Sequence, residues 1–416
     1  MDKTQSGLKP FPVTMQMVAD AHRKVKTKGK AYGVDEVNMK EFEQKLTGNL
    51  YKIWNRLASG TYFPPAVREV EIPKKDGKMR KLGIPTIGDR VAQTVVKDYM
   101  EASVDRLFHN NSYGYRPLKS AHQALTQARV NVNKFDWVID MDIKGFFDNI
   151  DHQLILKALD KVVEEKWVKM YCKRWLEMPV QKLDGTIVAK DGRGTPQGGV
   201  ISPLLANLFL HYAFDMWITK KHPQIHFERY ADDIIVHCQT QRQAEEILLQ
   251  ITQRMEQCKL ELHPLKTKIV YCKDARRKEP YKHVQFDFLG FSFQPRPTKE
   301  SKSEQIRNIF DLAISASSQK KITEEFTRMK ILRNSSVTIE EIADELYSKL
   351  QGWINYYGKF RKWVFLWVFR RLTYRLMRWV QDKYRISSIR DAYNWLRNYQ
   401  KVHLNLFAHW RYGYKQ

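Results

Sequence analysis

The chain has 416 residues, too many for one hydrophobic core, and its length fits two or three subdomains. Lys and Arg number 71 against 46 Asp and Glu, and the resulting formal net charge of +25 suits a polyanionic partner such as nucleic acid. No apolar run reaches the roughly 18 residues of a membrane span, and the start carries neither a secretory nor a lipidation signal. A cytoplasmic protein that does not contact membranes is therefore expected.

The first hundred residues change from a helical to an extended pattern. Apolar residues from Val37 to Leu57 recur at helical spacing, which predicts helix. Val67, Val70 and Ile72 then lead into residues 73–78, where an Asp-Gly pair marks a tight turn between two strands. A basic β-hairpin is expected there.

From Trp137 onward, short apolar strands alternate with helices. Strands are expected at 138–143, 234–236, 268–272 and 286–293. Helices are expected at 152–175 and 242–258. This α+β pattern predicts a small antiparallel sheet. Pro295-Arg296-Pro297 breaks it, and the chain from about Ser303 to the end is expected to form a separate all-helical domain rich in Arg, Trp and Tyr.

Two adjacent carboxylates, Asp232 and Asp233, lie at a turn between apolar strand residues. Burying such a pair requires compensating charge, and a divalent cation is the usual source; the alternative is an Asx-type turn with solvated acids. Asp142 ends another apolar strand about ninety positions earlier. Three hard oxygen donors at two strand ends suit two Mg²⁺ ions, with Mn²⁺ as a substitute, as in two-metal phosphoryl transfer.

The motifs around these acids resemble those of reverse transcriptases. Tyr230-Ala231-Asp232-Asp233 resembles the YxDD signature, Asp142 matches the acid of the first palm motif, and residues 194–207 resemble the PQG motif in its long group II intron form. Further matches to the fingers, the late palm and the thumb lie at residues 72–86, 108–117, 288–291 and 352–357. The sequence is thus identified as a member of the group II intron reverse transcriptases, and the resemblance covers nearly the whole chain.

The resemblance implies a right-hand polymerase fold of the α+β class, with a small antiparallel sheet and helices in fingers and palm and an all-helical thumb or maturase domain. The expected boundaries are 1–133 for the N-terminal extension and fingers, 134–297 for the palm, 298–390 for the thumb, and 391–416 for a short basic aromatic segment. No HNH-type endonuclease is expected, since its cysteine pairs and paired histidines are missing after Tyr399.

The resemblance also assigns roles at the catalytic site. Asp142 and Asp232 are the principal catalytic metal ligands, and Asp233 is a neighbouring, less direct one. Lys74 and Arg80 are expected to clamp the triphosphate of the incoming dNTP, since a point charge and a planar fork both suit phosphate. The alternative for this pair of cations is a solvated basic hairpin.

Three further residues are expected to contact the dNTP. Gln197 and the glycines after it let backbone approach the nascent base pair. Phe147 is expected to stack under the deoxyribose and exclude a 2′-hydroxyl, although Phe146 is open for that place and either ring suits a core position. Lys266 is a candidate general acid toward pyrophosphate, or else a surface lysine.

The helical C-terminal region mixes cations with aromatic rings, a composition that favours nucleic-acid binding. More than half of the aromatics are expected to form the core of the thumb, so the basic face carries the prediction. The expected nucleic-acid contacts are Arg361, Lys362, Arg370, Arg371, Arg375 and Arg378.

The function implied is RNA-directed DNA synthesis joined to maturase action, meaning that the protein binds intron RNA to assist splicing and supports retrohoming, in a bacterial host. The expected partners are structured intron RNA, an RNA template with a DNA primer, dNTPs and a DNA target. Three alternatives stay open: an RNA-binding maturase without polymerisation, a domesticated reverse transcriptase serving DNA repair or phage defence, and an RNA-dependent RNA polymerase.

Overall fold

The computed structural model describes residues 9–27, 31–73, 79–299 and 305–414. It divides into two compact units, Met1–Ala124 with Ile139–Lys268, and Leu125–Val138 with Ile269–Gln416. The chain therefore crosses between the units three times. The crossings lie in or beside α5 (Ala121–Asn131), β3 (Trp137–Asp142) and β8 (Lys268–Tyr271).

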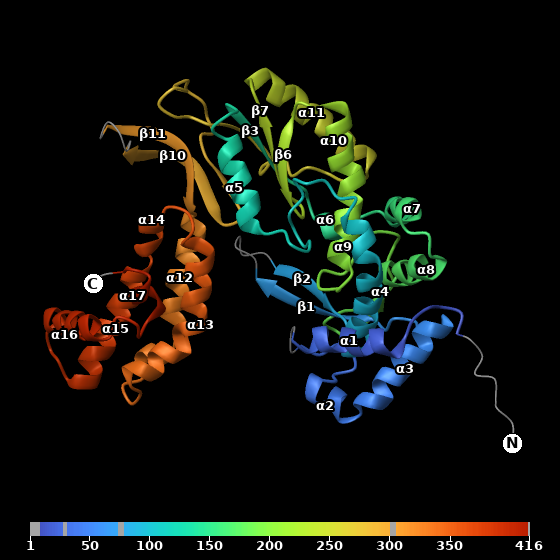
Figure 1. Ribbon diagram of the computed structural model, residues 1–416, viewed down its shortest axis with the longest axis horizontal. Coiled ribbons are helices and arrows are strands. Elements are labelled where there is room, and N and C mark those ends of the chain that lie inside the picture. Colours follow the sequence, from blue (N-terminus) through green and yellow to red (C-terminus); the bar gives the residue numbers. More distant parts are fainter. Residues whose placement is uncertain (1–8, 28–30, 74–78, 300–304, 415–416) are drawn as a thin grey trace. The chain divides into compact units, whose positions relative to one another are not determined.

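Helices make up much of the first unit (Figure 1). They are α1 (Met15–Lys26), α2 (Met39–Gln44), α3 (Leu46–Ser59), α4 (Ile87–Asp105), α6 (Phe146–Asn149), α7 (His152–Val162), α8 (Lys166–Leu176), α9 (Ser202–Leu210), the π-helix η1 (His211–Asp215), α10 (Met216–Lys221) and α11 (Gln241–Gln257). Helix α4 contacts α1, α3, α8 and α9. It begins where the Thr86 hydroxyl accepts a hydrogen bond from the Asp89 amide, and its buried run from Ile87 to Val96 fits a helix covered on several sides.

A four-stranded sheet with the order β6-β7-β3-β8 carries the two acidic strand ends. Strands β6 (His226–Tyr230) and β7 (Asp233–Cys238) form an antiparallel hairpin in which Tyr230 pairs with Asp233. Strands β7 and β3 are internal, and their runs of consecutive buried residues reflect cover on both faces. The strands predicted at 138–143, 234–236 and 268–272 are confirmed.

A second four-stranded sheet has the order β2-β1-β4-β5. Strands β1 (Val67–Pro73) and β2 (Met79–Ile84) are antiparallel, as predicted, while β4 (Val180–Gln181) runs parallel to β1 and pairs with β5 (Ile187–Val188). The turn of the basic hairpin, residues 74–78, lies outside the described residues.

The helical stretch predicted over 152–175 is confirmed, but it is not one continuous helix. The structure has two helices there, α7 and α8, separated by residues 163–165. Val163 is extended, with φ −120° and ψ 119°, a conformation that suits a β-branched residue. Glu164 and Glu165 then stand just before α8, where negative charge is favourable next to the positive end of the helix dipole.

The second unit contains a three-stranded antiparallel sheet, where a single strand was predicted at 286–293. Its strands, in the order β11-β10-β9, are β9 (Phe286–Phe288), β10 (Phe291–Lys299) and β11 (Ile306–Ile314). Leu289 and Gly290 turn the chain with φ of 50° and 80°.

The turn predicted at Pro295–Pro297 is also wrong, because β10 continues through it. Among the residues that the structure describes, β10 pairs only with β11 beyond Phe293, so its other edge accommodates residues that lack an N–H. The helical region therefore begins at Ala316 and not near Ser303.

The rest of the second unit is helical and shares one hydrophobic core (Figure 1). Its helices are α12 (Ala316–Arg328), the 3₁₀-helix η2 (Ile331–Arg333), α13 (Ile339–Tyr357), α14 (Lys362–Leu366), α15 (Phe369–Tyr384), α16 (Ile389–Val402) and α17 (Ala408–Arg411). Thr338 and Glu341 form a capping box at the start of α13. The predicted class, α+β with small sheets followed by an all-helical part, is confirmed. None of the described helices combines the length and apolar character needed to cross a membrane.

Candidate active site

The turn between β6 and β7 presents Asp232. Ala231 has φ 57°, in the left-handed region that costs a residue with a Cβ about 1–2 kcal/mol. Asp232 follows, half-buried, and Asp233 is the first residue of β7. Strained backbone of this kind persists only where the surroundings hold it, and it is frequent at functional sites.

Asp142 is the last residue of β3, the strand next to β7 in the sheet. The segment 263–267 fixes this strand end: the His263 amide donates to the Asp142 carbonyl at 2.7 Å, and the Asp142 amide donates to the Thr267 hydroxyl at 3.2 Å. The Asp142 carboxylate is 38 % exposed, and the Lys266 Nζ lies 3.3 Å from its Oδ2. The structure thus brings the candidate general acid Lys266 to a predicted metal ligand.

The two carboxylates influence each other electrostatically. Burial raises the pKa of the Asp232 carboxyl above its ordinary value, and the negative charge of Asp142 raises it further, while Arg80 and Arg229 oppose the shift. Two acids that share a partly buried place repel each other, and a cation bound between them relieves that repulsion.

Among the described residues, no group of three or more His, Cys, Asp or Glu side chains is spaced to hold a metal ion. This arrangement still fits magnesium, because proteins usually bind Mg²⁺ through one or two carboxylates and leave its other positions to water and substrate phosphates. Asp142 and Asp232 are suitable oxygen donors for such a site.

Arg80, predicted to bind the triphosphate, contacts Gln197, predicted to lie near the nascent base pair. Arg80 Nε donates to Gln197 Oε1 at 2.6 Å, and Gln197 Nε2 donates to both Asp148 oxygens at 3.3 Å. The backbones are also joined, since the Gly83 amide donates to the Gln197 carbonyl at 2.9 Å. A Cβ on Gly198 would lie 2.7 Å from the Gly83 carbonyl oxygen, so this approach requires glycine. Lys74 lies outside the described residues.

The two adjacent phenylalanines differ in burial. Phe146 is 2 % exposed and packs against Phe209 of α9, with ring centroids 6.3 Å apart. Phe147 is 9 % exposed, and its carbonyl accepts from the Thr195 amide of the PQG segment at 2.8 Å. Both rings are therefore buried, Phe146 more completely, and the main chain of Phe147 contacts the PQG segment.

Four of the six predicted nucleic-acid contacts lie on α15 of the second unit. Arg370 stacks over Trp367, with 3.2 Å between its guanidinium carbon and the ring centroid. Burial lowers the pKa of Arg375, and the neighbouring charges of Arg333, Arg371 and Arg378 lower it further. Within the described residues, Nε and Nη2 of Arg375 are buried without a hydrogen-bond partner. This cluster of positive charges is suited to binding an anion. Arg333 belongs to the cluster, although the sequence patterns did not predict it.

Arg361 does not join this cluster. Its side chain is only 7 % exposed, and it donates to Asp311 Oδ2 at 2.8 Å and to the Pro297 carbonyl at 2.9 Å. Those contacts make Arg361 a packing residue of the second unit, which weighs against the predicted nucleic-acid role. Lys362 is exposed, with its Nζ 4.1 Å from the centre of the Tyr412 ring.

Comparison with known families defines the class of protein. Residues 72–293 match the family model "Reverse transcriptase (RNA-dependent DNA polymerase)", and residues 319–399 match "Group II intron, maturase-specific domain". The first match alone covers more than half of the chain. The chain therefore belongs to the reverse transcriptases of the group II intron type, which are RNA-dependent DNA polymerases with a maturase-specific domain. The family implies divalent-metal catalysis and nucleic-acid binding.

Two sequence relatives and one solved structure are similar to this chain. Protein YkfC of Escherichia coli (strain K12) is 30 % identical over 281 residues, which are 58 % of this chain and 73 % of YkfC. The group II intron-encoded protein LtrA of Lactococcus lactis subsp. cremoris is 38 % identical over 161 residues, 38 % of this chain but only 26 % of LtrA. A structure of telomerase from Candida albicans covers 90 % of this chain, and 67 % of the telomerase chain is covered, at 11 % identity and a TM-score of 0.47.

Proposed function

We propose that this chain polymerises DNA on an RNA template at a site built from Asp142 and Asp232, and that its maturase domain binds structured intron RNA to assist splicing and support retrohoming. The observation that carries the first part is that the two acids lie at the ends of neighbouring strands, Asp142 as the last residue of β3 and Asp232 directly before β7. The negative charge of Asp142 also contributes to the raised pKa of Asp232. A bound divalent cation would instead lower the pKa of Asp232, because its positive charge favours the ionised carboxylate.

Asp142 and Asp232 would hold two Mg²⁺ ions, with Asp233 beside them and Mn²⁺ as a substitute. When bound, these ions lower the pKa of the primer 3′-hydroxyl and stabilise the pyrophosphate leaving group. Arg80 binds the triphosphate, because its planar guanidinium donates two parallel hydrogen bonds to phosphate oxygens. Lys266, 3.3 Å from Asp142, donates a proton to the departing pyrophosphate.

Discrimination against ribonucleotides is assigned to Phe147. The burial of Phe146 in the core supports this choice, because a ring packed against Phe209 is not available to a sugar. Gln197 links Arg80 to the loop before α9 and so couples triphosphate binding to the surface under the nascent base pair.

Primer extension on an RNA template with dNTPs and Mg²⁺ tests the polymerase proposal. Wild type is compared with Asp232→Asn, which keeps the shape of the side chain and removes its charge, after both proteins are shown to bind the template equally. Synthesis by the wild type alone supports the site. Absence of synthesis from both, with tight RNA binding retained, contradicts the polymerase proposal and leaves an RNA-binding maturase.

The RNA-binding proposal rests on the arginine cluster, defined as Arg333, Arg371, Arg375 and Arg378. Their mutual repulsion and the unpaired buried nitrogens of Arg375 within the described residues are relieved when phosphates bind between them. Exposed Trp363 and Tyr374 lie on the same helical region and offer faces for stacking.

The maturase proposal is tested with the RNA that flanks the reading frame. Splicing is followed at a low Mg²⁺ concentration with and without protein, and with a variant in which Arg371 and Arg378 are alanine. Protein-dependent splicing that the variant loses supports the proposal. Polymerase activity without any group II intron RNA at the locus points instead to a domesticated enzyme of DNA repair or phage defence.

A further inference from the structure

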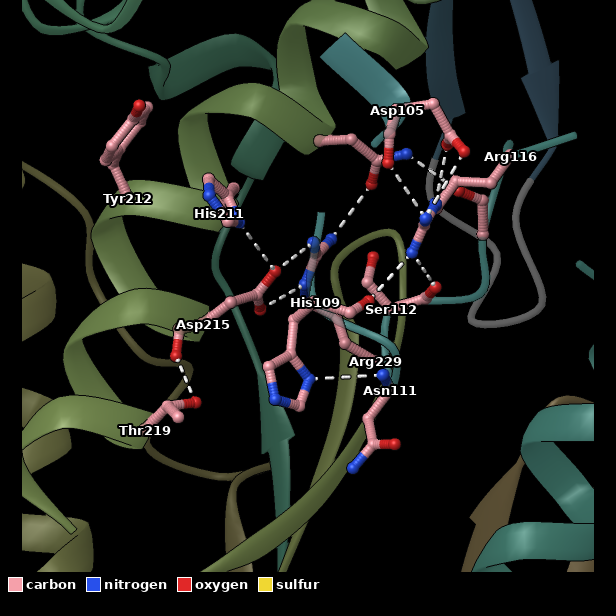
Figure 2. Close-up of polar contacts among 12 residues, drawn as sticks. Asp105, His109, Asn111, Ser112, Arg116, His211, Tyr212, Asp215, Thr219 and Arg229 are labelled. Atoms are coloured by element: carbon pink, nitrogen blue, oxygen red, sulfur yellow. Dashed lines mark hydrogen bonds and ion pairs between the residues drawn. The ribbon is translucent and has the colours of Figure 1, made fainter. Parts of the chain in front are cut away.

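A fully buried ion pair lies beside the turn that carries Asp232. Arg229, on β6, donates from Nε to Asp215 Oδ1 at 2.7 Å and from Nη2 to Asp215 Oδ2 at 2.6 Å, and both side chains are 0 % exposed (Figure 2). Asp215 ends the π-helix η1, which directly continues α9. Single π-turns of this kind occur frequently at functional sites, because they shift the direction of the side chains that follow.

The remaining arm of the guanidinium reaches the turn itself. Nη1 of Arg229 donates to the carbonyl of Ala231 at 3.1 Å and to Oδ1 of Asn207 at 2.9 Å. Ala231 is the left-handed residue whose carbonyl belongs to the peptide that joins it to Asp232. The arginine therefore fixes the orientation of the peptide directly before the proposed metal ligand.

Asn207 and the segment 111–114 hold the turn from other sides. Asn207 Nδ2 donates to the Gly114 carbonyl at 2.7 Å, and a Cβ on Gly114 would lie 2.4 Å from the Ala231 nitrogen. The Tyr113 amide donates to the Arg229 carbonyl at 2.8 Å, and the Arg229 amide donates to the Asn111 carbonyl at 2.9 Å. Both main-chain and side-chain groups of Arg229 are thus engaged in holding the hairpin.

We infer that Arg229, Asp215 and Asn207 are positioning residues that set the carboxylate of Asp232 relative to Asp142, so that the pair accepts metal with the correct spacing. A buried ion pair is a weak source of stability, because desolvation offsets its attraction. Its bidentate geometry and its third contact to Ala231 instead favour a geometric role. The inference rests on the proposed metal site.

The matched test replaces the pair by apolar residues of similar size, Arg229→Met with Asp215→Leu, which leaves no unpaired charge in the core. The control is the same exchange in an ion pair of the second unit, Arg277→Met with Asp274→Leu. Arg277 Nη2 donates to Asp274 Oδ2 at 2.6 Å, their side chains are 7 % and 4 % exposed, and Nη1 of Arg277 donates to the carbonyls of Val132 and Phe135. A third variant, Arg229→Lys, keeps the charge but lacks the planar fork.

The readout is the Mg²⁺ concentration that gives half the maximal rate of primer extension, with kcat and the thermal midpoint measured beside it. The half-saturating concentration does not depend on the fraction of protein that is folded. We expect the Arg229 variants to raise the half-saturating Mg²⁺ concentration at least fivefold and to lower kcat at least tenfold, and the Arg277 control to leave the Mg²⁺ requirement unchanged.

A lower maximal rate or thermal midpoint in both Arg229 variants, with an unchanged Mg²⁺ requirement, would overturn the inference. That result would show that the ion pair is purely structural. An equal rise in the Arg277 control would overturn the inference as well. Failure of the proposed function would give a different result. If Asp232→Asn still extended primers, the proposed metal site would be refuted, whatever the Arg229 variants do.

Discussion

Arg80 and Gln197, separated by 117 positions in the chain, are joined by a hydrogen bond of 2.6 Å from the guanidinium Nε to the side-chain carbonyl oxygen. This contact connects the β1–β2 hairpin to the PQG segment and holds a cation near Asp232, whose pKa it helps to lower. Arg80, which we propose to bind the triphosphate, is therefore oriented before substrate arrives, which reduces the ordering that binding requires.

Replacing Arg80 by alanine is expected to raise the KM for dNTPs at least tenfold, since a charge-assisted hydrogen bond contributes about 1.5–3 kcal/mol. Gln197→Ala is expected to have a smaller effect in the same direction, because Arg80 remains but is less well oriented. Steady-state primer extension at varied dNTP concentration measures both. The control is Lys81→Ala, which removes a neighbouring cation of β2 that pairs with Glu69; an equal rise there would contradict a specific role for Arg80.

Phe147→Ala is expected to increase incorporation of ribonucleotides relative to deoxyribonucleotides by more than tenfold while the protein stays folded. Phe146→Ala is expected instead to destabilise the fold by about 3–5 kcal/mol, because it removes a buried ring from the core. Incorporation ratios and thermal unfolding separate the two effects. Unchanged sugar selectivity in Phe147→Ala would exclude this ring and would suit an RNA-dependent RNA polymerase.

Arg371→Ala with Arg378→Ala is expected to weaken RNA binding and to reduce the slope of log K against log salt concentration by roughly 1.4–1.8, as for the loss of two phosphate contacts. Arg361→Ala serves as the contrast, because its guanidinium is engaged with Asp311. It is expected to lower the thermal midpoint and leave the salt slope unchanged. A reduced slope in Arg361→Ala alone would show that the binding surface lies elsewhere.

Asp89 gives the fold a pH dependence. Burial raises the pKa of this carboxyl to about 6, although Trp175, Gln93 and Tyr62 donate hydrogen bonds to it. A raised pKa means that its contribution to stability is fully present below the unfolded value, 3.8, and is lost as the pH rises through about 6. The free energy of unfolding is expected to lose roughly 3 kcal/mol from this group between pH 4 and pH 7.

The Asp89 contribution is measured as the difference between wild type and Asp89→Asn at the two pH values, which cancels groups common to both proteins. Because Gln93 donates to Asp89 and also accepts a hydrogen bond from the Ile201 amide at 3.2 Å, Asp89→Asn also disturbs the PQG segment. A difference that is constant across the pH range would contradict a raised pKa for Asp89.

Much of the site was accessible from sequence because local patterns determine it. The apolar run that ends in Asp142 and the one that follows Asp233 predicted two strand ends, and the structure places them on neighbouring strands. The pairing of Arg80 with Gln197 was not accessible, since only tertiary packing brings residues so distant in the chain together. Asp215 carried no local signal either, because the π-helix that directs it toward Arg229 has no distinct sequence pattern.

A metal site at Asp142 and Asp232 is tested by comparing Asp142→Asn with Asp140→Asn in single-nucleotide incorporation on an RNA template, over a range of Mg²⁺ and Mn²⁺ concentrations. Both residues lie on β3, but only Asp142 ends the strand beside Asp232, whereas Asp140 lies 3.9 Å from Lys268. We expect Asp142→Asn to lower the rate of nucleotide incorporation at least a thousandfold with either metal and to keep its RNA affinity. The rate of Asp140→Asn is expected to stay within about threefold of wild type. Near-normal incorporation by Asp142→Asn, or an equal loss in both variants, would contradict a metal site at Asp142 and Asp232.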